Sequence, residues 1–281
     1  MIHRTIGPTC LFRYAQALRR EERASATVEK YLRDAADFAA WLGPRPLSRD
    51  AAAGWKAHLL SRGLAPATVN AKLSALNGLL RSLGREDCRA RFLKLQRRAF
   101  RDEARDLSRG EYARLLRAAQ SSGRTRLALL LEAICSTGIR VSETRHFTVE
   151  AARRGRADVS LKGKIRTILL PGKLCRKLLQ FARTQKIASG EIFLARDGTN
   201  LSRCQIWREM KSLCQAAGVA PSKVFPHNLR HLFAAAFYQA TRDIVKLADI
   251  LGHSSINTTR IYLLSTGAEH VRQLERLRLV T

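Results

Sequence analysis

The stretch of residues 226–262 reads PHNLRHLFAAAFYQATRDIVKLADILGHSSINTTRIY and carries the clearest structural pattern in the chain. Its apolar residues recur at helical spacing, and Gly252 has the conformational freedom that ends a helix. Turn residues divide the stretch into three parts. We therefore expect three helices, over residues 228–239, 243–251 and 255–264.

Polar residues lie where these three helices begin and end. The turn at Pro226 places His227 and Arg230 at the start of the first helix. His253 lies on the turn before the third helix, which displays Tyr262. Taken one at a time, such residues are typical of an anion contact, a surface position or a core tyrosine. Their meaning depends on the rest of the chain.

Neither the histidines nor the cysteines indicate a metal site. His227 and His231 have the i, i+4 spacing of a zinc-binding helix, but Asn228 stands where that motif needs a glutamate. The six cysteines lack C-x-x-C spacing, and we expect them to be buried free thiols. They are Cys10, Cys88, Cys135, Cys175, Cys204 and Cys214.

Residues 107–225 precede this stretch and predict helices with one hairpin. Ser108 and Glu111 have the spacing of a capping box that starts a helix. The apolar segment 125–147 is interrupted at 136–138, after which Arg140 and Glu143 stand one turn apart, a spacing typical of an ion pair. The runs ADVSL and RTILLP flank the sequence KGK at 162–164, which predicts a hairpin with lysines at its tip.

The N-terminal part predicts a purely helical module. Amphipathic patterns predict a helix from Ser25, as its N-cap, to Gly43, a second that Ser48 opens and a third over 66–83. The third helix shows a polar face, which is either solvated or turned toward a phosphate backbone. Residues 85–106 are cationic and poorly periodic. We expect a module over 1–100, a linker over 101–106 and a mainly α C-terminal domain with a small antiparallel sheet over 107–281.

The charge of the chain points to a polyanionic partner. The 281 residues carry 51 Lys and Arg against 23 Asp and Glu, a net charge of +28. The excess is spread over both parts, with 21 against 11 over 1–106 and 30 against 12 over 107–281. No run of about 18 apolar residues and no lipidation motif favours a membrane. We therefore expect a bacterial, cytoplasmic protein that binds nucleic acid.

Five motifs in order resemble the tyrosine recombinase (phage integrase) family in its two-domain, Xer-like form. They are TGIRVSE at 137–143, KGK at 162–164, HNLRH at 227–231, LGHSS at 251–255 and TTRIY at 258–262. The N-terminal helices are similar to the SAM-like core-binding domain of this family. The resemblance implies a site-specific DNA recombinase or integrase that cleaves and rejoins duplex DNA without metal or nucleotide cofactor.

The resemblance also assigns roles to the matching positions. Tyr262 is the expected nucleophile, which forms a 3′-phosphotyrosyl intermediate, and Arg140 and Arg230 are the expected phosphate clamp. The remaining expected roles belong to His253 as a phosphate hydrogen-bond donor, Lys162 as the leaving-group acid, His227 as the general base and Glu143 as a supporting residue. Lys164 is the alternative to Lys162. We expect DNA contacts from Lys72, Arg81, Arg97 and Arg98.

The family resemblance implies partners that the residues do not specify. Duplex recombination sites and a homotetramer in the synaptic complex are expected, with an accessory directionality factor as a further partner. The C-terminal segment docks either in cis or on a neighbouring protomer. Alternative functions are a non-catalytic DNA-binding protein and a topoisomerase of the same chemistry. The target sequence, and the choice among integration, dimer resolution and inversion, stay open.

Overall fold

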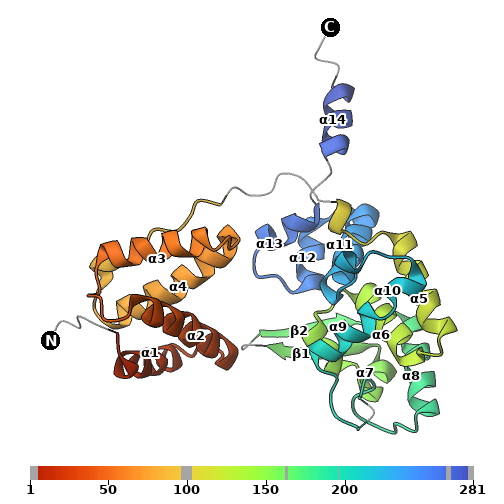
Figure 1. Cartoon of the computed structure of the whole chain (residues 1–281). Coiled ribbons are helices and arrows are strands. Elements are labelled where there is room, and N and C mark those ends of the chain that lie inside the picture. Colours follow the sequence, from red (N-terminus) through yellow and green to blue (C-terminus); the bar gives the residue numbers. More distant parts are fainter. Residues whose placement is uncertain (1–5, 96–102, 162–163, 196, 264–266, 278–281) are drawn as a thin grey trace. The chain divides into compact units, whose positions relative to one another are not determined.

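The computed structural model describes residues 6–95, 103–161, 164–195, 197–263 and 267–277 (Figure 1). In this part the chain is mainly helical with one two-stranded antiparallel sheet, which confirms the predicted fold class. The chain divides into two compact units, Met1–Arg97 and Arg98–Thr281. Within the described residues no helix combines the length and apolar character that a membrane span requires.

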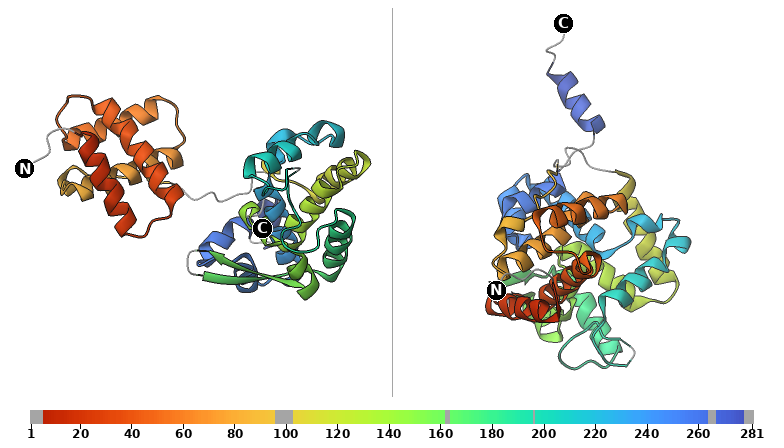
Figure 2. Two further views of the ribbon diagram at one scale, coloured as in Figure 1. Left: turned by 90° about the horizontal axis from the view of Figure 1, so that it is seen from below. Right: turned by 60° about the vertical axis from the view of Figure 1, so that its left-hand side comes forward.

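In residues 6–95, the described part of the N-terminal unit, four α-helices surround an apolar core. Two features of this unit differ from the prediction. Helix α1 was not predicted, and the N-cap of α2 is Ala24, without a side-chain hydrogen bond, instead of Ser25. Ser48 caps α3 as expected, accepting a hydrogen bond from the Ala51 amide. The elements are α1 (Pro8–Arg20), α2 (Ser25–Leu42), α3 (Arg49–Ser61), α4 (Pro66–Ser82) and the short η1 (Glu86–Cys88). Helix α4 packs against the other three helices (Figure 2).

Two asparagines on the polar face of α4 bind the chain that follows it. The Asn77 side chain donates to the Ala90 carbonyl at 3.0 Å and accepts from the Ala90 amide at 2.9 Å. Asn70 forms the same pair with Leu93, at 2.9 and 2.8 Å. These bonds hold residues 90–93 on the helix. Part of the poorly periodic stretch 85–106 is therefore packed on the N-terminal unit.

The C-terminal unit is built around helix α6 (Thr125–Thr137), which is buried on most of its surface. Helices α5, α8 and α11 pack against it. The predicted helix over 228–239 extends at both ends, from Pro226 to Thr241. The other elements are η2 (Glu103–Arg105), α5 (Arg109–Ser121), η3 (Val141–His146), α7 (Val149–Arg154), β1 (Arg156–Leu161), β2 (Lys164–Leu169), α8 (Gly172–Thr184), α9 (Arg203–Lys211), α10 (Cys214–Ala217), η4 (Pro221–Lys223), α11 (Pro226–Thr241), α12 (Ile244–Leu251), α13 (Ile256–Arg260), η5 (Ile261–Leu263) and α14 (Gly267–Arg276).

Local signals in the sequence account for several of these boundaries. The Ser108 and Glu111 capping box is formed at the start of α5. Gly252 ends α12 in the left-handed conformation, as expected. Four of the six cysteines are buried, but Cys204 is exposed, so the expectation of buried thiols was wrong there.

Gly138 ends helix α6 and lets α11 approach it closely. Its φ is +64°, and a Cβ atom there would lie 2.3 Å from Cδ1 of Phe233 on α11. Any larger residue would force α6 and α11 apart, because Phe233 is held within an apolar cluster. The fit at Gly138 therefore fixes the distance between the two helices that carry the TGIR and HNLRH motifs.

We predict that Gly138→Ala lowers the free energy of unfolding by about 2–4 kcal/mol, the sum of left-handed strain and the clash with Phe233. Gly155→Ala is the matched control, because Gly155 ends α7 with φ +70° and no atom lies within 4 Å of the position that a Cβ would take there. That change costs about 1 kcal/mol through strain alone. Chemical denaturation of both variants measures the difference, and equal losses would contradict the close-approach argument.

Candidate active site

Arg230, on the first turns of α11, is a buried cation at the meeting point of two helix ends. Its side chain is 1% exposed. Its guanidinium donates to the carbonyl of Gly138, at the end of α6, and to that of Leu251, at the end of α12, the latter at 2.8 Å. The last carbonyls of a helix lack intrahelical donors and carry partial negative charge. Two such ends therefore stabilise one guanidinium without a carboxylate partner.

His253 lies on the turn after α12 and contacts Arg230 directly. Its Nε2 is 2.9 Å from Arg230 Nη2, and its Nδ1 is 2.9 Å from Thr259 Oγ1. Because a guanidinium only donates, Nε2 accepts and Nδ1 carries the proton. Burial, together with the charges of Arg230, Arg140 and Arg166, lowers the pKa of His253 to about 4. His253 is therefore neutral in this structure.

Tyr262, on η5, is packed among the histidines of the site. It is only 6% exposed. Its ring centroid lies 5.9 Å from that of His253 in a stacked arrangement, 6.3 Å from that of His227 and 4.4 Å from that of His231. The His231 ring is thus the nearest of the three to that of Tyr262. Burial lowers the pKa of His227, and the charges of Arg230 and Arg140 lower it further.

Glu143 and Arg140 form the ion pair that their spacing predicts. The Glu143 side chain is 1% exposed; its Oε1 lies 3.1 Å from Arg140 Nη1, and its Oε2 accepts from the Arg140 amide at 2.8 Å. The Arg140 side chain remains 42% exposed. One face of this guanidinium is therefore open to an anion, while the carboxylate holds the other.

Arg166, on β2, belongs to this site and was not predicted from the sequence. Its Nη2 lies 2.7 Å from Glu143 Oε2, and its Nη1 donates to the Ile250 carbonyl near the end of α12 at 3.0 Å. One signal was available. Arg166 and the apolar Ile168 are two positions apart on β2, so they share one strand face, and Ile168 is buried there. A charged residue on the buried face of a strand indicates a buried partner.

The predicted lysines and DNA contacts have different outcomes. Lys162, Arg97 and Arg98 lie outside the described residues. Lys164 opens β2, paired with Leu161 of β1, so two residues connect the strands.

Lys72, a predicted DNA contact, forms ion pairs within the N-terminal unit. Its Nζ lies 3.0 Å from Asp34 Oδ1 and 2.7 Å from Asp37 Oδ2, both on α2. Its side chain is 18% exposed. Lys72 therefore pairs with carboxylates inside the unit, which compete with a phosphate for its charge. Arg81 is exposed and stays a predicted contact.

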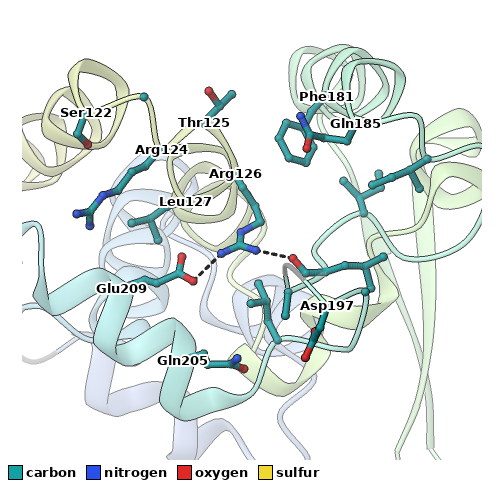
Figure 3. A pocket seen from close by; sticks show the side chains of 17 residues that line it. Ser122, Arg124, Thr125, Arg126, Leu127, Phe181, Gln185, Asp197, Gln205 and Glu209 are labelled. Atoms are coloured by element: carbon teal, nitrogen blue, oxygen red, sulfur yellow. Dashed lines mark hydrogen bonds and ion pairs between the residues drawn. The ribbon is translucent and has the colours of Figure 1, made fainter.

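The site is separate from a large cavity of the C-terminal unit. That cavity, of about 1130 Å³, is lined by parts of α6, α8 and α9 and by the loop before α9 (Figure 3). Arg126 crosses it, with Glu209 and the Leu194 carbonyl each 2.6 Å away. None of the predicted site residues that the structure describes lines it. In the part of the chain that the structure describes, no group of three His, Cys, Asp or Glu residues is arranged to hold a metal ion.

Comparison with known families identifies the chain. The model of the Phage integrase family matches residues 105–269, which contain the residues of the candidate active site from Arg140 to Tyr262. The model of the phage integrase N-terminal SAM-like domain matches residues 11–87. The chain belongs to the phage integrase family. It is an enzyme of the tyrosine recombinase class, a site-specific DNA recombinase.

Individual relatives agree with this assignment. The chain is 28% identical to tyrosine recombinase XerA of Pyrococcus furiosus, over 100% of this chain and 98% of the relative. It is 32% identical to tyrosine recombinase XerC of Erythrobacter litoralis, over 71% and 69% of the two chains. A lambda integrase tetramer bound to a Holliday junction has the same fold, with a TM-score of 0.73 at 19% identity, over 90% of this chain and 76% of that one.

We predict that the stability of the free protein falls as the pH drops from 7 to 5. The pKa of His253 is about 4 in the folded chain and about 6.5 as the ordinary value, so the unfolded chain binds more protons in this interval. His253 is partly exposed, so we expect a loss of about 1–2 kcal/mol after solvent screening. Denaturation at several pH values measures it. His253→Gln has less to lose over the same interval, and an unchanged slope in that variant would contradict this origin.

Proposed function

We propose that Tyr262 is the nucleophile of a metal-independent DNA strand exchange. The Tyr262 oxygen attacks the scissile phosphorus and loses its proton to a base, while the bond from phosphorus to the 5′-oxygen breaks and that oxygen takes up a proton. The products are a 3′-phosphotyrosyl bond and a 5′-hydroxyl. Attack by a 5′-hydroxyl of another strand reverses these steps, so one phosphoester replaces another and no nucleotide is consumed.

The observation that carries this proposal is the convergence of Tyr262, Arg230 and His253. Tyr262 lies on η5, Arg230 on α11 and His253 on the turn after α12. Arg230 and His253 are within hydrogen-bond distance, and the rings of His253 and Tyr262 are stacked. A transition state with five oxygens on phosphorus needs cations at its non-bridging oxygens. It also needs a nucleophile with a proton acceptor nearby. Arg140 and Arg230 supply the cations, and His227 is the proposed base.

The free protein holds these groups in a resting arrangement. Arg230 is 1% exposed and Tyr262 lies near it; burial lowers the pKa of Arg230, and the neighbouring Tyr262 hydroxyl offsets part of that shift. A phosphate reaches this guanidinium only after Tyr262 and His253 shift away. Arg140 is exposed in the same state. We infer that Arg140 engages the phosphate first and that Arg230 joins when Tyr262 moves into line.

His253 has to change its role when DNA binds. In the free protein its Nε2 accepts from Arg230, and an acceptor nitrogen cannot donate to a phosphate oxygen. An anionic phosphate between the two side chains replaces that contact and favours the protonated imidazole. Lys162 as the leaving-group acid, with Lys164 as the alternative, and Glu143 as the supporting residue complete the proposed site.

The partners follow from the family and from the surface of the chain. We propose duplex DNA as the substrate, with residues 1–100 as a DNA-binding module, 101–106 as a linker and 107–281 as the catalytic domain. The similarity to the lambda integrase tetramer supports a homotetramer. So do three exposed apolar side chains at the C-terminal end, Val271 and Leu274 on α14 and Leu277 directly after it. An accessory directionality factor and a bacterial cytoplasmic location stay predictions.

Trapping of a covalent adduct tests the proposed nucleophile. Wild type and Tyr262→Phe are incubated in EDTA with a pool of nicked suicide duplexes, and the products are separated on a denaturing gel. We expect an adduct with wild type only, because the substitution removes the attacking hydroxyl and no positive charge. DNA affinity, from a parallel shift assay, should stay within about threefold.

Two other outcomes would overturn the proposal. An adduct with Tyr262→Phe at the wild-type rate would assign the nucleophile to another residue. A wild-type protein that binds the pool but forms no adduct would contradict autonomous catalysis. Sequencing the trapped DNA of the expected outcome gives the site used in later experiments.

The ion pairs of Lys72 give a prediction about DNA binding. Arg81→Ala should weaken binding to the duplex pool about three- to tenfold and reduce the slope of log K against log salt by about one, because one phosphate contact is lost. Lys72→Met should leave that slope unchanged and lower the stability by about 1 kcal/mol, because Asp34 and Asp37 lose their shared cation. Salt titrations and denaturation curves separate the two residues, and a reduced slope for Lys72→Met would restore it as a DNA contact.

A further inference from the structure

We propose that Arg166 is a positioning residue that sets the phosphate clamp by holding Glu143 and the end of α12 in place. This inference rests on the proposed function, because it concerns the orientation of Arg140 and Arg230 toward a scissile phosphate. Arg166 itself is not a catalytic residue in this proposal. It acts through the groups that it binds.

The contacts of Arg166 join three segments of the site. From β2 its guanidinium reaches Glu143 Oε2 at 2.7 Å and the Ile250 carbonyl at 3.0 Å. Glu143 in turn fixes both the amide and the guanidinium of Arg140. Ile250 precedes Leu251, whose carbonyl accepts from Arg230. Arg140 is therefore linked to Arg166 through Glu143, and Arg230 is linked to it through the adjacent carbonyl groups of Ile250 and Leu251.

The surroundings of Arg166 keep it from contacting DNA itself. Its side chain is 13% exposed, compared with 42% for Arg140. Gly252 lies directly against it, since a Cβ atom at Gly252 would stand 2.4 Å from Arg166 Cδ. The glycine of the LGHSS motif therefore provides space for this arginine in addition to ending α12.

The loss of Arg166 has a definite consequence for Arg140. Glu143 is 1% exposed, and without Arg166 its Oε2 keeps only the Arg140 amide as a donor. A buried carboxylate with fewer partners draws nearby cations toward itself. We expect the Arg140 guanidinium to turn inward, away from the position that a phosphate occupies. A misplacement of about 1 Å is enough to slow a positioned reaction roughly 100-fold.

A neutral scissile group distinguishes this positioning role from a merely structural one. A methylphosphonate replaces one non-bridging oxygen by a methyl group and removes the negative charge that the arginines stabilise. A variant with a damaged clamp therefore loses less on this substrate than on the phosphodiester. A variant that only destabilises the domain loses the same factor on both substrates.

The experiment measures the rate of adduct formation on the suicide duplex recovered from the trapping pool, with either a phosphodiester or a methylphosphonate at the cleaved position. Arg140→Ala is the reference for a damaged clamp. Arg126→Met is the matched structural control, because Arg126 also donates one bond to a glutamate and one to a backbone carbonyl, away from the site.

We expect Arg166→Met to slow cleavage of the phosphodiester about 100-fold and that of the methylphosphonate less than about fivefold, the pattern of Arg140→Ala. Arg166→Lys keeps the charge but reaches one partner at a time, so it should recover part of the rate; it also serves if the Met variant does not fold. Equal loss on both substrates, as for Arg126→Met, would overturn the positioning role. The absence of any wild-type adduct would instead refute the proposed function.

Discussion

The burial of one guanidinium governs the arrangement of the C-terminal unit. Arg230 has no carboxylate partner among the described residues, and its charge is stabilised by the carbonyl ends of α6 and α12. The contact requires both helices to end at the same point, which the left-handed glycines Gly138 and Gly252 allow. Because an unpaired buried cation is strongly unfavourable, the packing of α6, α11 and α12 and the position of Arg230 are determined together.

This arrangement gives the site an electrostatic character that suits a phosphodiester. Arg140, Arg166 and Arg230 face a single carboxylate among the described residues, that of Glu143, and the lowered pKa values of His227 and His253 reflect burial and the excess of cations. Proteins keep like charges this close when an anion completes the site. The resting protein satisfies its donors with carbonyls and a histidine nitrogen, which a phosphate can replace.

The two units use polar side chains in different ways. In the N-terminal unit, Asn70 and Asn77 bind backbone groups of the following chain, and Lys72 binds two carboxylates. All three lie on the polar face of α4, for which the sequence predicts either solvation or a phosphate backbone. Helical spacing shows that residues share a face, but it does not show what packs against that face.

Most helices of the C-terminal unit, the hairpin, the family and the order of Arg140, Arg230, His253 and Tyr262 could be predicted from the sequence, because turn residues, apolar periodicity and motif spacing are local properties. The folded structure was needed to show that Arg166 joins the site, that Tyr262 lies near Arg230 in the free protein and that Lys72 pairs with Asp34 and Asp37. Each of these depends on contacts between residues at least 23 positions apart in the chain, and local sequence carries no information about such distances.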